Sequence, residues 1–272
     1  MYRTYVINLK RDIERYHNLK RELAKRNVPV QRFDAIYGKE IKDYGKYSKY
    51  ISKYCQIFCP SGLVGCGLSH YVLLDQIYQS YITNDPDGNV PQYTLVLEDD
   101  VVPLFEDKTV IDAIVQRMPD DADILLLYCQ GQCGYAFKPG TVALAKKYLI
   151  PQGQMIGSTA AYVIRNTSIP KFLKDKLTFH VDLQWYLNPD IKVSIYNDQL
   201  FAIKNDHSYN LDPSQAKRPI AHILDSLPFY FDNTTLSESL AFKIFKIPLV
   251  NVELSAMDVI IILITALVAS KI

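Results

Sequence analysis

The stretch TYVINLKRDIERYHNLKRELAKRNVPVQRFDAI, residues 4–36, decides the fold class of this chain. Residues 4–9 have the alternating pattern of a β-strand, and residues 28–36 form a second run of strand type. Between them Asn27 suits a helix C-cap, and apolar side chains recur at helical spacing beside a basic face: Ile13, Tyr16, Leu19, Leu23 and Ala24. A strand, a helix and a strand within about 30 residues form a βαβ unit, which predicts parallel pairing.

Strands and helices continue to alternate to about residue 205, and this predicts an α/β fold around a mostly parallel sheet. A glycine-rich turn is expected to lead into a helix within residues 61–82. Further elements are expected as strands at 93–102, 123–129 and 155–164, helices at 108–117 and 166–177, and a strand pair or one bent strand at 191–205.

Two segments lack this periodicity. Residues 39–53 are polar, basic and rich in tyrosine, and we interpret them as a mobile or inserted loop. After residue 208 the pattern loosens, so we expect a catalytic domain at 1–208 and a C-terminal extension at 209–272.

The composition is that of a globular protein. Of 272 residues, 49% are hydrophobic and 22% charged, which is enough material for a sizeable core. The net charge of +1 gives no electrostatic reason to expect a nucleic acid as partner. No apolar signal-peptide segment precedes the first strand, so we expect a cytoplasmic protein.

The chain contains five cysteines, an odd number that includes two C-x3-C pairs: Cys55, Cys59, Cys66, Cys129 and Cys133. Such pairs allow metal ligands or disulfides. Structural zinc sites usually have C-x2-C spacing with a matching cysteine or histidine pair, so we favour reduced, partly buried thiols.

The C-terminus carries an uncharged apolar run at residues 259–270. A membrane-spanning helix needs about 20 such residues, and this run is shorter. We therefore favour a buried or interfacial helix. The alternative is a short tail anchor, which would associate the protein with a membrane.

Glu98, Asp99 and Asp100 directly follow an apolar strand, residues 93–97. Ligands of open α/β sheets gather where strands end, and clustered carboxylates repel one another unless a cation is present. A hard divalent ion, Mn²⁺ or Mg²⁺, suits such oxygen ligands. The alternative is that Asp99 or Asp100 caps the following turn.

Several blocks of the sequence resemble, in order and spacing, glycosyltransferase family 25: VINLKRDIERYHNLKRELAKRNVPVQRFDAIYGKE, GLVGCGLSHYVLLDQI, YTLVLEDDV, GSTAAYVI and FHVDLQWYL. That family includes bacterial lipooligosaccharide galactosyltransferases and collagen hydroxylysine galactosyltransferases. The resemblance implies a GT-A type nucleotide-sugar-binding fold, a nucleotide-sugar donor, and a DxD-like acidic motif whose divalent ion bridges the donor diphosphate.

On this sequence the resemblance assigns the metal to the acidic triplet, with Asp100 first and Glu98 or Asp99 second. On an extended strand Glu98 and Asp100 would face one side and Asp99 the other, whereas a loop that begins inside the triplet would change this assignment. Asp99 is also a candidate for donor binding. His207, which follows a later strand, is a further candidate metal ligand; surface loop chemistry explains it equally well.

Three residues outside the triplet are candidates for donor binding. Asn8 and Arg11 follow the first strand, where a GT-A fold receives its nucleotide, and His70 lies in a family-like block. Arg11 could instead be solvated, and His70 could be structural. Asp182 is the candidate general base, with a helix N-cap as its alternative role.

The function implied is transfer of a hexose, galactose from UDP-galactose, to a glycan or a hydroxylated protein side chain, with inversion. Two other classes stay open. One is a metal-dependent phosphohydrolase, and the other is a non-catalytic scaffold that binds glycans or attaches to a membrane.

Overall fold

A computed structural model of the chain describes residues 2–83, 91–128, 142–144, 158–186, 188–196, 198, 200–204, 230–231, 234–235, 243–247 and 252–270. Their main element is a seven-stranded sheet. Its strands are β1 (Tyr2–Asn8), β2 (Gln31–Asp34), β3 (Tyr93–Glu98), β5 (Ile124–Leu126), β6 (Val142–Leu144), β7 (Ala161–Arg165) and β8 (Val193–Tyr196). Their order in the sheet is β2-β1-β3-β7-β5-β8-β6.

Five of the seven strands run in one direction. β1 is parallel to β2 and β3, β5 is parallel to β8, and β7 lies antiparallel between β3 and β5. The edge strand β6 is also antiparallel to its neighbour. The mostly parallel α/β fold is therefore confirmed, with the register Ile7↔Glu98 aligning the ends of β1 and β3.

The opening βαβ unit has the predicted form. Helix α1 (Ile13–Ala24) joins the parallel strands β1 and β2 and buries Tyr16, Leu19 and Leu23. Asn27 has a φ of 60°, the left-handed conformation that ends a helix. The residue chosen from sequence as the cap therefore has the cap's backbone conformation.

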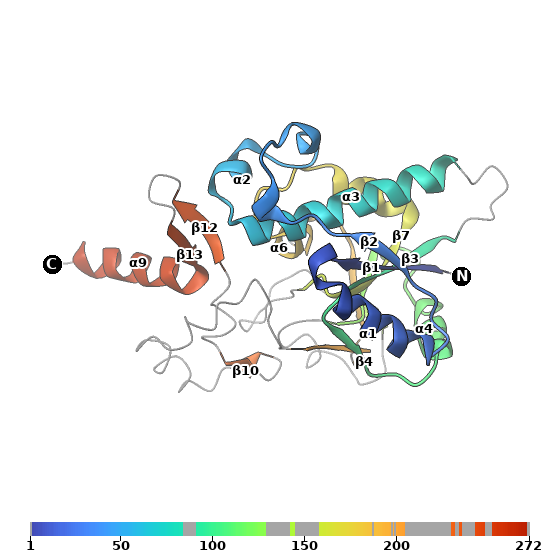
Figure 1. Ribbon diagram of the computed structural model, residues 1–272. Coiled ribbons are helices and arrows are strands. Elements are labelled where there is room, and N and C mark those ends of the chain that lie inside the picture. Colours follow the sequence, from blue (N-terminus) through green and yellow to red (C-terminus); the bar gives the residue numbers. More distant parts are fainter. Residues whose placement is uncertain are drawn as a thin grey trace.

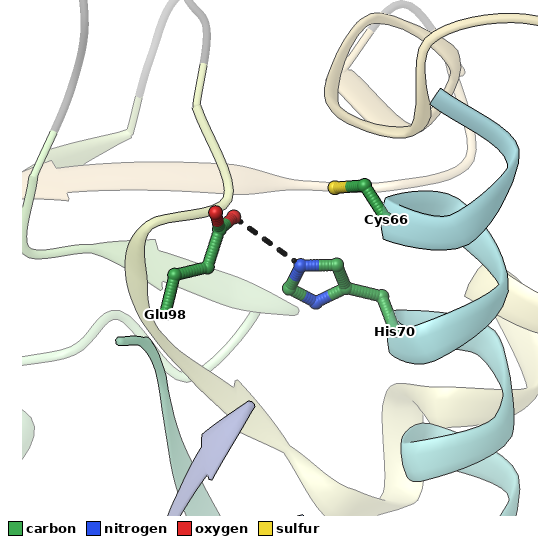
Figure 2. A group of neighbouring side chains, drawn as sticks. All are labelled: Cys66, His70 and Glu98. Carbon is green, nitrogen blue, oxygen red and sulfur yellow. Dashed lines mark hydrogen bonds and ion pairs between the residues drawn. The ribbon is translucent and has the colours of Figure 1, made fainter. Parts of the chain in front are cut away.

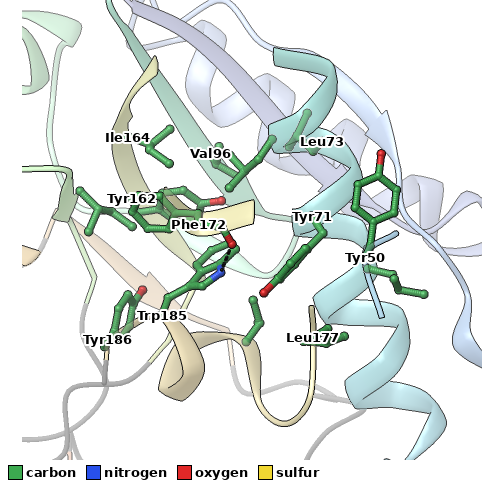
Figure 3. Close-up of a cluster of buried hydrophobic side chains, with 14 of the residues drawn as sticks. Tyr50, Tyr71, Leu73, Val96, Tyr162, Ile164, Phe172, Leu177, Trp185 and Tyr186 are labelled. Atoms are coloured by element: carbon green, nitrogen blue, oxygen red, sulfur yellow. Dashed lines mark hydrogen bonds between the residues drawn. The ribbon is translucent and has the colours of Figure 1, made fainter. Parts of the chain in front are cut away.

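Helices cover both faces of the sheet (Figure 1). Because side chains alternate along a strand, Leu95 and Leu97 pack against α1 and α4 (Lys108–Val115), whereas Val96 packs on the opposite face. On that face lie α3 (Ser61–Thr83), α5 (Ile169–Leu173) and α6 (Val181–Tyr186). Figure 3 shows the aromatic centre of this layer around Trp185, whose Nε1 donates to the Phe172 carbonyl at 3.2 Å.

The glycine-rich stretch is not a turn, because residues 61–67 already belong to α3, a single 23-residue helix. A Cβ on Gly65 would lie 2.6 Å from the Ile36 carbonyl oxygen and 2.7 Å from the Gly38 nitrogen. The glycine thus permits close approach between α3 and the segment after β2, which is why the turn expectation was wrong.

Residues 39–53 form a loop, as expected, and its end is anchored to the core. The segment contains two 3₁₀ turns, Gly38–Glu40 and Gly45–Tyr47, and leads into α2 (Lys53–Phe58). Tyr50 and Ile51 are buried, and Ile51 forms a β-bridge with Leu177. Aromatic and apolar side chains fix the segment although it has no periodicity.

Residues 191–205 form two strands that do not pair with each other. β8 joins the central sheet, whereas β9 (Phe201–Ile203) pairs antiparallel with β4 (Val101–Pro103). The strand β4 begins directly after the acidic triplet, so β9 supports the region where the sheet ends.

The cysteines only partly follow the expectation of reduced thiols. Cys55 and Cys59 form a disulfide at the end of α2, which corrects that expectation for this pair. Cys66 is a free, half-buried thiol on α3. Cys129 and Cys133 lie outside the described residues.

The C-terminal elements are β10 (Tyr230–Phe231), β11 (Thr234–Thr235), β12 (Lys243–Ile247), β13 (Val252–Ser255) and α9 (Ala256–Ala269). Ser255 and Asp258 form a capping box at the start of α9. The apolar side chains of α9 are exposed, so it is not a core helix: Ile260, Ile262, Leu263, Ile264, Leu267 and Val268. In the described part of the chain no helix is both long and apolar enough to cross a membrane. The expected domain boundary after residue 208 falls outside the described residues.

Candidate active site

The acidic triplet spans the end of β3 and the turn that follows it. Glu98 is the last residue of β3, and Asp99 and Asp100 form the turn into β4. The Glu98 N–H donates to the Ala160 carbonyl at 2.8 Å, and the Lys204 N–H donates to the Asp100 carbonyl at 2.8 Å. Backbone bonds from two other segments thus hold three carboxylates at the edge of the sheet.

Asp99 is held by the first strand and the first helix. Asn8 Nδ2 donates to Asp99 Oδ2 at 2.6 Å, and Arg15 Nη1 lies 3.6 Å from Asp99 Oδ1. Burial raises the pKa of Asp99, and these two contacts oppose the rise. Asn8 therefore contacts the acidic turn itself, at the strand end where donor binding was expected.

Glu98 faces α3 and β7. Its Oε1 accepts a hydrogen bond from Thr159 Oγ1 at 2.8 Å and lies 3.4 Å from His70 Nε2. Burial alone would raise the pKa of Glu98, but the His70 and Thr159 contacts outweigh it and the pKa is lowered. These contacts thus favour the ionised form of Glu98.

Asp100 has the most unfavourable environment of the three. Its Oδ1 is buried and has no hydrogen-bond partner in the described part of the chain. Burial, followed by the charges of Glu98 and Asp99, raises the pKa of Asp100 to about 7. A divalent cation next to this oxygen would offset both the cost of burying the charge and the repulsion from the other two carboxylates. These residues therefore fit a metal ion.

A cavity of about 240 Å³ opens in front of the triplet. Its lining comes from the end of β1, the start of α1, residues 35–39 after β2, and the first turns of α3, including Ser61 and Gly62. Arg11 lies at the mouth, where its Nη1 donates to the Tyr37 hydroxyl at 2.8 Å and its guanidinium stacks on that ring. Two arginines and the positive end of a long helix therefore line the same cavity as the carboxylates.

This arrangement suits a cation together with an anion. The carboxylates on one wall can bind a divalent ion, while Arg11, Arg15 and the N–H groups at the start of α3 can bind phosphate oxygens. Arg11, His70, Glu98 and the two aspartates of the turn all line the cavity, so the structure brings together five sequence-selected residues. His207 lies outside the described residues.

Asp182 does not line this cavity. Its carboxylate accepts hydrogen bonds from Ser158 N at 2.8 Å, Leu183 N at 2.7 Å and His180 Nδ1 at 2.9 Å. Burial would raise the pKa of Asp182, but these donors overcome it and lower the pKa to about 2. Its charge nevertheless contributes to raising the pKa of Cys66, which does line the cavity.

Sequence reasoning missed His180, Cys66 and Thr159. His180 lies two residues before Asp182 and forms an ion pair with it. Cys66 precedes His70 by four residues, a helical spacing that went unnoticed because the region was interpreted as a turn. Thr159 has no sequence signal, because only the pairing of β3 with β7 brings it to Glu98.

Comparison with known proteins identifies the family of this architecture. Residues 1–185 match the family model described as Glycosyltransferase family 25 (LPS biosynthesis protein). A protein of Haemophilus influenzae named "Putative glycosyltransferase" is 26% identical over 129 residues, which is 47% of this chain and 42% of the relative. The chain thus spans less than half the length of this curated relative.

Proposed function

This chain belongs to glycosyltransferase family 25, and from that membership we propose that it transfers a hexose from a UDP-sugar with the help of a divalent metal ion. The proposed donor is UDP-galactose, and the acceptor is a glycan or a hydroxylated protein side chain. The observation that supports the metal is the buried Oδ1 of Asp100, which lies beside two further carboxylates and has no hydrogen-bond partner among the described residues.

Asp100, with Asp99 or Glu98, would hold Mn²⁺ or Mg²⁺, which when bound supplies positive charge that stabilises the leaving diphosphate. His207 is kept as a further candidate ligand. Asp99 orients the turn through its bond from Asn8 and its ion pair with Arg15. Arg11 and the start of α3, which line the same cavity, would bind the diphosphate oxygens.

For an inverting displacement a base must take the proton of the acceptor hydroxyl. A carboxylate with a pKa of about 2 is a weak base, so Asp182 does not suit this role alone. Although burial lowers the pKa of His180, the charge and hydrogen bond of Asp182 raise it above the ordinary value. We therefore assign the proton to the His180 imidazole, with Asp182 as the group that holds the ring.

The phosphohydrolase alternative is less well supported. Phosphohydrolases with an aspartyl nucleophile have a D-x-D-x-T/V pattern after the first strand, whereas EDDVV has adjacent aspartates. Membership in a glycosyltransferase family also favours a transferase over a phosphohydrolase.

A donor panel tests the proposal. Slow hydrolysis of UDP-sugars is measured with and without Mn²⁺ for the wild type and for Asp100→Ala. We expect Mn²⁺-dependent consumption of one UDP-hexose and at least about a 100-fold loss in the variant, because an ionic stabiliser of the leaving group is removed. Consumption of no UDP-sugar, or equal activity of the variant, would overturn the mechanism. Metal-dependent UDP binding without turnover would favour the scaffold, and phosphate release from simple esters the hydrolase.

A further inference from the structure

Cys66 and His70 lie one helical turn apart on α3, and both face Glu98 at the end of β3 (Figure 2). One ligand atom from each residue lies within 4.8 Å of the other two. Sulfur, imidazole nitrogen and carboxylate oxygen together form the ligand set that zinc-like ions prefer. We propose that Cys66, His70 and Glu98 bind one divalent transition metal of the zinc class, with a fourth coordination position that no residue in the described part of the chain fills.

The distance between His70 and Glu98 supports a bridging ion. Their Nε2 and Oε1 atoms are 3.4 Å apart, whereas a charge-assisted hydrogen bond is about 2.7–2.9 Å long. In a tetrahedral zinc site with bonds of about 2.0–2.1 Å, neighbouring ligand atoms are about 3.3 Å apart. The pair is thus spaced as two ligands of one ion.

Neighbouring groups hold two of the ligands in place. His70 Nδ1 forms a 3.0 Å hydrogen bond with the Tyr162 hydroxyl, which turns Nε2 toward Glu98. Glu98 Oε1 accepts a bond from Thr159 at 2.8 Å. Hydrogen bonds of this kind orient the ligands of metal sites and are part of the site's affinity.

The electrostatic surroundings favour a cation at this position. His70 is only 1% exposed. The charges of Glu98, Asp182 and Asp100 act on the Cys66 thiol. Three carboxylates near one thiol give this wall of the cavity a negative potential, and a bound divalent ion would favour the thiolate.

The open position gives the site a function beyond the hard-ion role proposed for Asp100. Cys66, His70 and Glu98 all line the cavity, so a fourth ligand would come from water or from an oxygen of a bound substrate. Sites with three protein ligands and one open position bind reactive groups, whereas purely structural zinc sites have four protein ligands.

Cobalt is the probe for this site, because Co²⁺ in a thiolate site gives a charge-transfer band and tetrahedral visible bands. The full chain, freed of metal with a chelator, is titrated anaerobically with Co²⁺. We expect one equivalent to bind with both signals and to be displaced by Zn²⁺. In Cys66→Ser the charge-transfer band should be lost, and in His70→Gln the affinity should fall about 100-fold or more.

The double variant Cys129→Ser/Cys133→Ser is the matched control, and it should keep the wild-type spectrum. No charge-transfer band in the wild type, or a band that survives Cys66→Ser, would overturn the site. Circular dichroism of Cys66→Ser checks that its fold is intact. The spectroscopic measurement needs no donor sugar. It can therefore support the metal site even if no UDP-sugar is transferred, and UDP-sugar transfer can be observed even if this metal site is absent.

Discussion

Asp100 is a carboxylate whose surroundings disfavour its ionised form. Its pKa is raised from the ordinary 3.8 to about 7, first by burial and then by Glu98 and Asp99. The sequence was sufficient to select this carboxylate, because an acidic triplet follows an apolar strand and the flanking blocks resemble glycosyltransferase family 25. It could not show that Oδ1 is buried without a donor, since that depends on how the turn is enclosed.

The raised pKa predicts a pH-dependent stability of the metal-free protein. The folded state holds the Asp100 proton more tightly than the unfolded state, so stability falls as the pH rises from about 4 to about 7. Asp100→Asn should remove this loss and stabilise the metal-free protein at neutral pH by up to about 4 kcal/mol. Chemical denaturation in chelator at several pH values measures it.

The surface variant Asp190→Asn, which breaks an exposed ion pair with Lys174, is the control and should leave the pH slope unchanged. Mn²⁺ should stabilise the wild type more than Asp100→Asn. An unchanged pH slope in Asp100→Asn would contradict the burial argument.

The His180–Asp182 pair predicts a pH limb in catalysis. Asp182 raises the pKa of His180, and a protonated imidazole cannot accept the acceptor's proton. Transfer should therefore fall as the pH drops below that pKa. His180→Gln should lower kcat about 100-fold and abolish this limb, with little change in the KM for the donor. A variant that keeps the limb would show that another group titrates.

At the scale of elements, periodicity predicts the βαβ unit well and the start of α3 poorly. Tyr16, Leu19 and Leu23 mark the buried face of α1 directly, because they pack in one core cluster on one face of the sheet, whereas Ala24 is exposed. In α3 the glycines suggest a turn, although they serve close packing against the segment after β2. A glycine's role depends on what lies opposite, which the sequence does not contain.

Two glycines of α3 form a matched pair for testing this packing. A Cβ on Gly65 would meet backbone atoms of Ile36 and Gly38, whereas one on Gly67 would meet only the Leu177 side chain, at 2.5 Å. Both changes to alanine gain about 1 kcal/mol of helix propensity. Backbone atoms cannot rotate away as a side chain can. Gly65→Ala should therefore lower the free energy of unfolding by about 2–3 kcal/mol, and Gly67→Ala should lower it clearly less. Equal melting temperatures for the two variants would refute this account of the helix packing.

At the scale of the whole molecule, the cavity is built from segments far apart in sequence. The end of β1, residues 35–39, the start of α3 and the acidic turn meet there. The parallel arrangement made part of this predictable, because the ends of parallel strands share one edge. Cys66 and Thr159 reach Glu98 only because of where helix α3 and the antiparallel strand β7 lie against the sheet. The sequence carries no local signal for that placement.

The exposed apolar helix α9 is the other whole-molecule feature, and we propose that it attaches the protein to a membrane surface. Six large apolar side chains of α9 are more than 40% exposed, and the helix is too short to span a bilayer. The double variant Leu263→Glu/Leu267→Glu should bind lipid vesicles about 100-fold more weakly in co-sedimentation, because two apolar side chains would no longer enter the interface.

Ile82→Glu is the matched control, since Ile82 is 53% exposed on a different helix, α3. This variant should sediment with vesicles as the wild type does, and all three proteins should hydrolyse the UDP-sugar donor at the same rate, because α9 contributes no residue to the cavity lining. The contrary outcome is a wild type that binds no vesicles and self-associates through α9, which a lower particle mass in solution for the double variant would show. In that case α9 packs against a second copy of the chain, and the membrane proposal is wrong.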